Sequence, residues 1–227
     1  MIGNFAWSIA QQTRDMEYFG CMGKVARHSS SLPLRSKNKL VETWLRDDDS
    51  PWLWMVDADM IFDDGHAMKL WECASENNAK IVSGLAFIFH GMSQPTPSYF
   101  LWGDDPRVLA AGQTDYNPQD LVNPNNWIPD EPIEVAATGL ASVLIHRDVF
   151  ETMQPDFHEA YRWFHTFKLN YAGEPFGEDM QFFVRCQELG FKHMLEPRAR
   201  THHVKEISVD YDAWTRAWKK SGEDSTH

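Results

Sequence analysis

The feature that most constrains the fold is a segment in which two apolar runs flank a helical pattern. Residues 52–56 are all apolar, and residues 79–89 form a second, largely apolar run. Apolar runs of this length are typical of strands buried on both faces of a parallel sheet. Between them, the apolar residues of 67–74 recur at helical spacing, and Asp63 or Asp64 is the expected N-cap. The segment therefore predicts a strand, a helix and a second strand.

This alternation indicates an α/β fold with a mainly parallel central sheet flanked by helices, in which ligands bind at the carboxyl ends of strands. Asp57 and Asp59 directly follow the first apolar run and would lie at such an end. Two close carboxylates repel each other unless a cation joins them, and Mg²⁺ or Mn²⁺ commonly binds one or two carboxylates together with substrate phosphates. The two aspartates therefore predict a divalent metal site, although Asp-x-Asp also occurs by chance in acidic proteins.

The remaining patterns extend this architecture over most of the chain. Helical patterns lie at residues 2–10, 37–46, 147–153, 177–190 and 211–218, and strand-like patterns lie at residues 133–145 and 193–195. Residues 91–132 are rich in Pro, Gly, Asn and Asp, which predicts an ordered excursion that covers the substrate. We expect one domain over residues 1–206, followed by a C-terminal helix and tail over residues 207–227.

Composition narrows the class of protein. The chain has 227 residues, of which 43% are hydrophobic, and this suits one globular domain. No apolar run approaches the roughly 20 residues of a membrane span, so a cytoplasmic protein is expected. The scattered cysteines Cys21, Cys73 and Cys186 have no disulfide or zinc-ligand spacing. A net charge of −12 disfavours nucleic acid, although the basic residues from Lys24 to Lys39 could hold phosphates.

A second acidic group lies at the start of a predicted helix. Gly177 precedes Glu178 and Asp179, where the helix dipole favours negative charge. One interpretation is an N-terminal cap. The other makes Asp179, with Glu178 beside it, the catalytic carboxylate that takes a proton from an acceptor hydroxyl. The local sequence allows both.

Three late residues could add to a phosphate or metal site. His203 could supply an imidazole nitrogen to a metal, although the adjacent His202 leaves the choice of ligand open. Lys205 would suit a diphosphate.

Four aromatic residues in loop-rich stretches could stack against sugar rings or cover the core; they are Trp102, Trp127, Trp163 and Phe164.

Four stretches of the chain together resemble the GT-A glycosyltransferases, in particular the small stand-alone enzymes of bacteria and bacteriophages related to the inverting family-two group. The stretches are RSKNKL at 35–40, WLWMVDADM at 52–60, EVAATG at 134–139 with LIHR at 144–147, and GED at 177–179 with THHVK at 201–205. Their order and spacing match over roughly residues 1–206. GT-A chains normally begin with a strand that binds the nucleotide base, and here the chain begins inside the following helix. A GT-A fold without its first strand is therefore expected, in a bacterium or a phage-infected host cell.

The resemblance implies metal-dependent transfer of a sugar from a nucleotide-diphosphate sugar, with a UDP-sugar as the expected donor. Asp57, Asp59 and His203 would hold Mn²⁺ or Mg²⁺ against the diphosphate, and Asp179 would be the base of an inverting displacement. The residues expected to contact the donor or acceptor are Arg35, Asn38, Asp57, Gly139, Trp163 and Lys205. The acceptor could be a glycan, a protein or a modified nucleobase.

Two other functions remain open. A haloacid-dehalogenase-like phosphatase also places Asp-x-Asp at a strand end and uses Mg²⁺, but its motif normally lies on the first strand, whereas a helical region comes first here. A non-catalytic remnant that binds a sugar nucleotide or a glycan would retain the same residues. Trapping of a phosphoaspartate at Asp57 would identify the phosphatase, and donor binding without turnover would identify the remnant.

Overall fold

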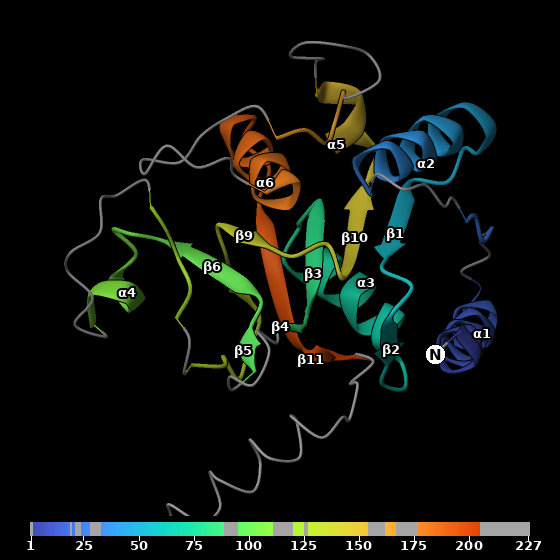
Figure 1. Cartoon of the computed structure of the whole chain (residues 1–227), viewed down its shortest axis with the longest axis horizontal. Helices are drawn as coiled ribbons and strands as arrows, with labels where there is room; N and C mark the ends of the chain where they lie inside the picture. Colours follow the sequence, from blue (N-terminus) through green and yellow to red (C-terminus); the bar gives the residue numbers. More distant parts are fainter. Residues whose placement is uncertain are drawn as a thin grey trace, which may run out of the picture.

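The computed structural model describes residues 2–18, 20, 24–27, 33–88, 95–110, 120–124, 127–153, 162–166 and 177–204 (Figure 1). Its helices are α1 (Ile2–Tyr18), α2 (Pro33–Asp47), α3 (His66–Glu76), α4 (Pro106–Ala110), α5 (Arg147–Thr152) and α6 (Glu178–Glu188). Its strands are β1 (Trp52–Val56), β2 (Met60–Phe62), β3 (Ile81–Leu85), β4 (Phe87–Ile88), β5 (Thr96–Pro97), β6 (Tyr99–Trp102), β7 (Leu121–Val122), β8 (Ile133–Glu134), β9 (Ala137–Thr138), β10 (Ser142–His146) and β11 (His193–His203). None of the described helices is long and apolar enough to cross a membrane. The helix expected at residues 211–218 lies outside the described residues.

The central sheet is mixed, which corrects the expectation of a mainly parallel sheet. Its strand order is β1-β10-β3-β11-β2, and β8 also pairs with β11. Among the strands that the structure describes, only β3 and β11 pair in parallel, whereas β10 pairs antiparallel with both β1 and β3. The two strands of the predicted strand–helix–strand unit, β1 and β3, are therefore separated by β10. Apolar runs report burial and not strand direction, so the sequence pattern did not reveal this insertion.

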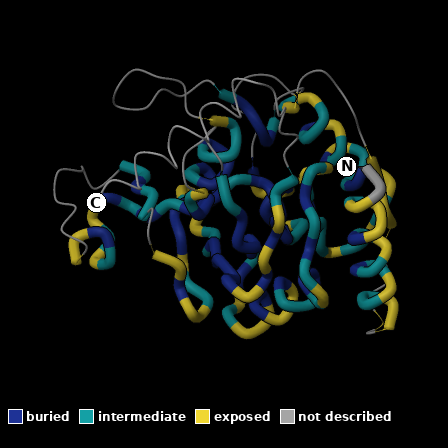
Figure 2. Tube along the Cα trace, turned by 60° about the horizontal axis from the view of Figure 1, so that its bottom comes forward, coloured by how far each residue is buried: buried dark blue, intermediate teal, exposed yellow. Residues whose placement is uncertain are grey.

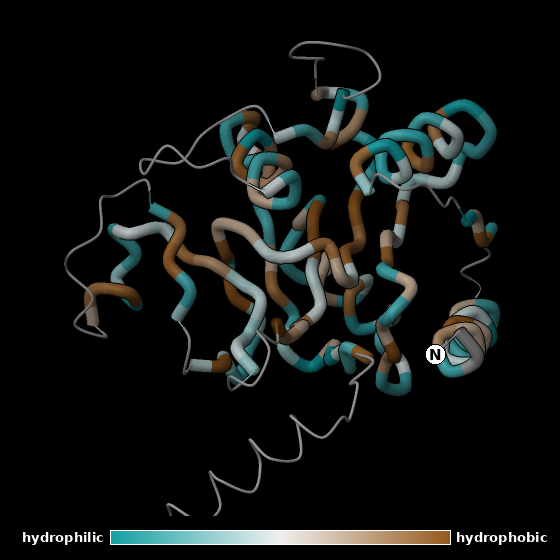
Figure 3. The backbone as a smooth tube through the Cα atoms, viewed as in Figure 1, coloured by the Kyte–Doolittle hydropathy of each residue, from teal (hydrophilic) through white to brown (hydrophobic). Residues whose placement is uncertain are grey.

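Helices cover both faces of the sheet, as expected for an α/β fold. One apolar cluster joins α2, α5 and α6 to the sheet through residues such as Val41, Val143 and Phe182. A second cluster joins α3 to the opposite face through Leu70, Leu144 and other residues. Successive residues of β10 thus point to opposite layers, because side chains alternate along a strand. Buried residues gather in the sheet in Figure 2, and apolar residues occupy the same strands in Figure 3.

Strand β1 lies at an edge of the sheet. Of its residues only Met55 is buried, and the others are half-buried. The expected burial on both faces is therefore wrong for this strand. The indole of Trp54 packs against the rings of Phe62 and His66 and donates a hydrogen bond to Ser142 Oγ at 3.0 Å. The N-cap of α3 also differs from expectation, because Gly65, with φ of 68°, occupies that position in place of Asp63 or Asp64.

Strand β11 is longer than expected and changes partner along its length. Its first part pairs with β3, the register shifts between Glu196 and Arg200, and its last part pairs with β2. In Figure 1 this strand bends below β3 and runs toward β2. The bend carries the end of β11 to the turn that joins β1 to β2. This path brings the C-terminal part of the described chain beside Asp57 and Asp59.

Described strands of the proline-rich excursion and of its two flanks form two small antiparallel sheets. In one sheet β6 pairs with β7 and with β9, and in the other β4 pairs with β5. Tyr99, Leu101 and Val135 are buried between the three-stranded sheet and the central one. Strand β9 then leads through Gly139 into β10. The excursion is thus anchored beside the main sheet by its own core, and it borders the C-terminal end of α6 (Figure 1).

Candidate active site

Asp59 and His203 meet at the junction of β2 and β11. His203 Nε2 lies 2.8 Å from Asp59 Oδ2, and the backbone N–H of Val204 donates to the carbonyl of Asp59 at 2.9 Å. The antiparallel pairing of His203 with Met60 fixes this contact. Two of the residues predicted to bind metal, 144 positions apart in sequence, therefore lie side by side.

The partners of His203 constrain its chemistry. Its Nδ1 lies 3.3 Å from the carbonyl oxygen of Phe87, which can only accept a hydrogen bond, so Nδ1 carries the proton. In a neutral ring Nε2 then has a lone pair that faces a carboxylate oxygen. Two lone pairs at this distance repel each other unless a proton lies between them. The Asp59–His203 pair thus has the spacing of a hydrogen bond, and its imidazole nitrogen and carboxylate oxygen are also donor atoms of the kinds that bind divalent metal ions.

The structure distinguishes His203 from its neighbour. Adjacent residues of a strand point in opposite directions, so His202 faces away from Asp59. His202 is exposed, and its Nε2 lies 2.7 Å from Asp63 Oδ1. The alternative that the sequence left open is therefore decided in favour of His203 as the neighbour of Asp59.

Asp57 has an electrostatic environment that disfavours its negative charge. Its backbone N–H donates to the carbonyl of Ala141 at 3.2 Å, which ties the end of β1 to the start of β10. Although the residue is exposed, the surrounding protein limits hydration of the carboxylate and raises its pKa to about 6. The charges of Asp179 and Asp59 raise it further, whereas Lys37 and His203 act in the opposite direction. An added cation here would relieve this repulsion.

The donor set is nevertheless incomplete for a metal held by protein alone. Within the described ranges, no three His, Cys, Asp or Glu side chains come together closely enough to surround a metal ion. The Asp59–His203 pair fits a site of the kind that Mn²⁺ and Mg²⁺ use, in which substrate phosphates and water supply the other ligands. The fit to a divalent metal therefore rests on two protein ligands, Asp59 and His203, and on the neighbouring charge of Asp57.

Asp179 and Glu178 share one ammonium group at the N-terminus of α6. Lys37 Nζ, on α2, lies 2.7 Å from Asp179 Oδ1 and 3.0 Å from Glu178 Oε1. The other Asp179 oxygen, Oδ2, accepts a hydrogen bond from the backbone N–H of Leu140 at 3.2 Å. The sequence shows Lys37 as part of a basic run and of the RSKNKL stretch, but it does not reveal this contact, because α2 and α6 meet only after folding.

The two carboxylates differ in how this shared charge affects them. Burial opposes ionisation of both, and for Asp179 it outweighs the attraction of Lys37, so the pKa of Asp179 is raised. For Glu178 the attraction of Lys37 outweighs burial, and its pKa is lowered. Burial also opposes the charge of Lys37, but the two carboxylates more than compensate and raise the pKa of this lysine. A carboxylate with a raised pKa is a stronger proton acceptor, which suits a general base.

Gly139 lies directly before Leu140, beside Asp179. A Cβ at Gly139 would be 2.8 Å from Ser98 Oγ, and the Gly139 N–H lies 3.3 Å from that same oxygen. A glycine therefore suits this position because the segment packs closely against Ser98. The segment in turn presents the Leu140 N–H to Asp179.

Other predicted site residues lie elsewhere. The buried Asn38 uses its amide to hold a loop, donating to Leu34 and Phe164 and accepting from the N–H groups of Trp163 and Phe164. Trp163 is only 4% exposed and donates its indole N–H to the Phe150 carbonyl, so it belongs to the core. Arg35 is exposed near the start of α2. Lys205 lies outside the described residues.

Comparisons with known proteins give a likeness of fold only. The sequence matches no protein-family model, and it matches no curated protein. Among solved structures, A197 from STIV has a TM-score of 0.51 and 13% identity, and the match covers 86% of this chain and 80% of that one. GalNAc-T7 with UDP, GalNAc and Mn²⁺ has a TM-score of 0.49 and 12% identity, and the match covers 86% of this chain but 34% of that one. The chain therefore shares the fold of A197.

Proposed function

We propose that the chain is a metal-dependent glycosyltransferase of the GT-A type, which moves a sugar from a nucleotide-diphosphate sugar to an acceptor hydroxyl. The observation that carries this proposal is the contact between Asp59 and His203 in an acidic environment that includes Asp57 and Asp179. The order of the four sequence stretches that resemble this family supports it. A UDP-sugar is the proposed donor.

Asp59 and His203 would hold Mn²⁺ or Mg²⁺, and Asp57 would lie close enough to favour a cation there. When bound, such a cation would stabilise the negative charge of the leaving diphosphate. The protein supplies the cation's position through the end of β11, which is paired with β2.

Asp179 is the proposed general base. The acceptor hydroxyl transfers its proton to the Asp179 carboxylate while its oxygen forms a bond to the sugar's anomeric carbon. The bond between that carbon and the diphosphate oxygen breaks, and the diphosphate leaves with the electron pair. Attack on the side opposite the leaving group inverts the anomeric configuration. Lys37 and the Leu140 N–H hold the Asp179 carboxylate in place. The ammonium group of Lys37 also compensates part of the negative charge of this carboxylate until the acceptor binds.

The test is a thermal-shift titration with UDP-glucose, UDP-N-acetylglucosamine and GDP-mannose, each with Mn²⁺ and with chelator. A ligand that binds only the folded state raises the melting temperature. We expect one donor to do so only with the metal, and Asp59→Asn to weaken that binding roughly 10- to 100-fold. The matched control is Asp63→Asn, which removes a carboxylate that pairs with the neighbouring His202 and should leave donor binding unchanged.

The third variant separates binding from chemistry. Asp179→Asn should retain the donor-dependent shift and lose sugar transfer, because it removes the proton acceptor while leaving the Asp59–His203 pair intact. Donor binding that persists in Asp59→Asn, or that needs no metal, would contradict the proposed metal site. Full transfer activity in Asp179→Asn would contradict the proposed base.

A further inference from the structure

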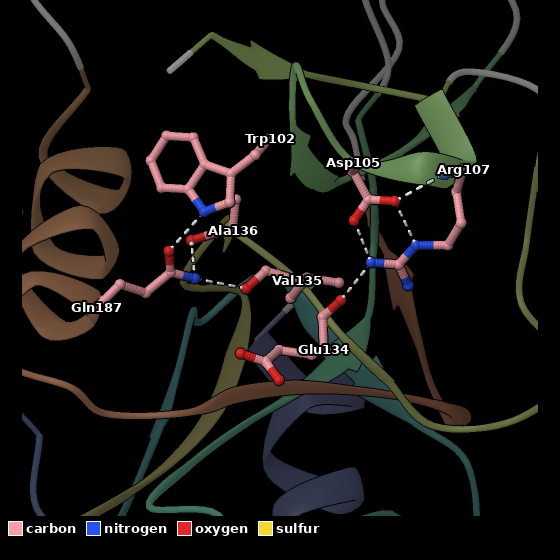
Figure 4. Close-up of a pocket in the computed structure, with 7 residues that line it drawn as sticks. All are labelled: Trp102, Asp105, Arg107, Glu134, Val135, Ala136 and Gln187. Carbon is pink, nitrogen blue, oxygen red and sulfur yellow. Dashed lines mark hydrogen bonds and ion pairs between the residues drawn. The ribbon is translucent and has the colours of Figure 1, made fainter. Parts of the chain in front are cut away.

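A pocket of about 260 Å³ lies between the C-terminal end of α6 and the excursion that contains β6 and α4. Its walls in Figure 4 are two pairs of side chains on opposite sides, Trp102 with Gln187 and Asp105 with Arg107. The backbone next to Glu134 lies between them. This volume is just below the range of about 300–1,000 Å³ that is usual for small-molecule sites, so the pocket suits a ligand of about one ring.

Hydrogen bonds hold both walls in place. The Trp102 indole N–H donates to Gln187 Oε1 at 2.8 Å, and Gln187 Nε2 donates to the carbonyls of Val135 and Ala136 at 2.8 and 3.2 Å. On the other wall, Arg107 Nε and Nη2 donate to the two carboxylate oxygens of Asp105, and Nη2 also donates to the Glu134 carbonyl. A ligand would meet a preformed surface and would not have to order these side chains.

The pocket retains hydrogen-bonding groups that are available to a ligand. None of the described hydrogen bonds uses the Nη1 donors of Arg107 or the exposed carboxylate of Glu134, although the charge of Glu134 acts on Arg107. Trp102 is half-buried, so part of its indole ring borders the pocket. A fixed aromatic ring with both a donor and an acceptor nearby suits a ring that carries hydroxyl groups, because each hydroxyl can donate and accept.

The charge of the lining selects among polar ligands. The side chains of Asp105 and Glu134 are acidic, and Arg107 is the only basic residue among the described residues of the lining. This lining carries more negative than positive charge. The guanidinium of Arg107 already donates hydrogen bonds to both carboxylate oxygens of Asp105. A phosphate or another anion would be repelled, whereas a neutral polyhydroxylated ligand would not.

The pocket lies a short distance from the proposed base. Asp179 and Gln187 are eight positions apart on the same helix, which corresponds to about 12 Å at the α-helical rise. Ala136 on the pocket floor and Leu140, which donates to Asp179, are four residues apart, and an extended chain spans about 13 Å over that length. The second figure is an upper limit, because Ala136 lies in a bend and Leu140 in a turn. Along the backbone, the pocket is therefore within about 13 Å of the proposed base.

We propose that this pocket is a saccharide subsite, which holds a neutral sugar of the acceptor beyond the one that receives the new bond. Such a subsite makes the acceptor of the proposed transferase a neutral oligosaccharide, so the inference rests on the proposed function. Trp102 packs against the sugar ring, Arg107 donates to its hydroxyls, and Glu134 accepts from them.

The test measures binding of maltotriose, cellotriose, mannotriose and chitotriose to the whole protein by saturation-transfer NMR, without donor or metal. We expect at least one trisaccharide to bind, and Trp102→Ala to weaken it roughly tenfold. Glu134→Ala should weaken it by roughly three- to tenfold, and this exposed residue can be replaced without a large effect on folding. The matched control is Trp71→Ala, which removes a tryptophan that is 42% exposed on α3.

The outcomes separate this inference from the proposed function. Asp59→Asn should bind the trisaccharide as the wild type does, so loss of the donor site and loss of the subsite are measured independently. The inference is overturned if no trisaccharide binds the wild type, or if Trp102→Ala and Glu134→Ala both bind like Trp71→Ala. Binding of UMP that Trp102→Ala abolishes would also overturn it, because the pocket would then accept an anionic nucleotide.

Discussion

At the scale of single residues, Lys37 has the most unusual position in the candidate site. It is the only described cation in direct contact with Asp179 and Glu178, and its side chain is 13% exposed. By contrast, Lys39, two residues away, pairs with Glu42 at the surface. One residue of the basic run thus compensates buried charge, while its neighbour forms a solvated pair. Removing the buried partner leaves two carboxylates without their counter-ion, which costs far more than loss of a surface pair.

We therefore predict that Lys37→Met lowers the free energy of unfolding at pH 7 by about 1–3 kcal/mol, and Lys39→Met by less than about 0.5 kcal/mol. Without Lys37, the folded-state pKa values of Asp179 and Glu178 rise above their unfolded values, so the stability deficit of the variant relative to the wild type should shrink as the pH falls and these groups take up protons. Urea unfolding at pH 7 and pH 5 measures both effects. Equal losses in the two variants would show that Lys37 is not a buried counter-ion.

At the scale of elements, α1 completes the hydrogen bonding of the edge strand β2. The Ser8 hydroxyl accepts from the Phe62 N–H at 2.8 Å and contacts the Phe62 carbonyl at 3.4 Å, and both residues are buried. Gln12 donates to the Asp63 carbonyl and accepts from the Ala67 N–H, which ties α1 to the start of α3. An uncovered edge strand would expose its backbone groups, so α1 protects the strand that pairs with His203.

Ser8→Ala should therefore destabilise the protein by about 1–3 kcal/mol, because it leaves a buried backbone N–H without a partner. Thr13→Ala is the matched control on the same helix. Thr13 donates only to the carbonyl of Ile9, one turn before it, and alanine favours the helix, so its replacement should change stability by no more than about 0.5 kcal/mol. Chemical denaturation of both variants measures the difference. Similar values for the two would show that Ser8 does not secure β2.

At the scale of the whole molecule, two histidines whose pKa values are lowered by burial lie in the packed layers. His193 is fully buried against Phe183, with ring centroids 4.2 Å apart, and burial lowers its pKa to about 3. His66 lies on α3 beside Ser142 and Arg200, and burial lowers its pKa to about 4. In the unfolded chain a histidine titrates near 6.5. Between about pH 6.5 and 4 the unfolded state therefore binds protons that the folded state does not.

The free energy of unfolding should consequently fall as the pH is lowered through this window, by up to about 1.4 kcal/mol per pH unit for each histidine. His193→Gln removes one of these groups while an amide can still bond to Ser83, so its stability should decline less steeply than that of the wild type. Urea unfolding at intervals from pH 6.5 to pH 4.5 gives the two slopes. Parallel slopes would mean that His193 takes up a proton in the folded state.

The local sequence by itself determined most of the elements and the acidic residues of the site. Helical spacing predicted α2 and α3, and the apolar runs predicted β1 and β3. Gly190, which has a φ of 81°, marked the end of α6. The local sequence reveals these features because they depend on contacts between residues near in the chain. The resemblance to GT-A enzymes singled out Asp57, Asp59, Asp179 and His203. In the structure Asp59 contacts His203, and the charges of Asp59, Asp179 and His203 act on Asp57; the roles of these residues are proposals.

Only the tertiary structure decided the sheet order and the partners of the site residues. The insertion of β10 between β1 and β3, and the bend that brings β11 to β2, depend on strand pairings between distant parts of the chain, and local periodicity does not specify them. The same holds for Lys37, which meets Asp179 only because α2 and α6 pack on the same face of the sheet. The choice of His203 over His202 follows from the pairing of β11 with β2, which turns alternate side chains to opposite faces.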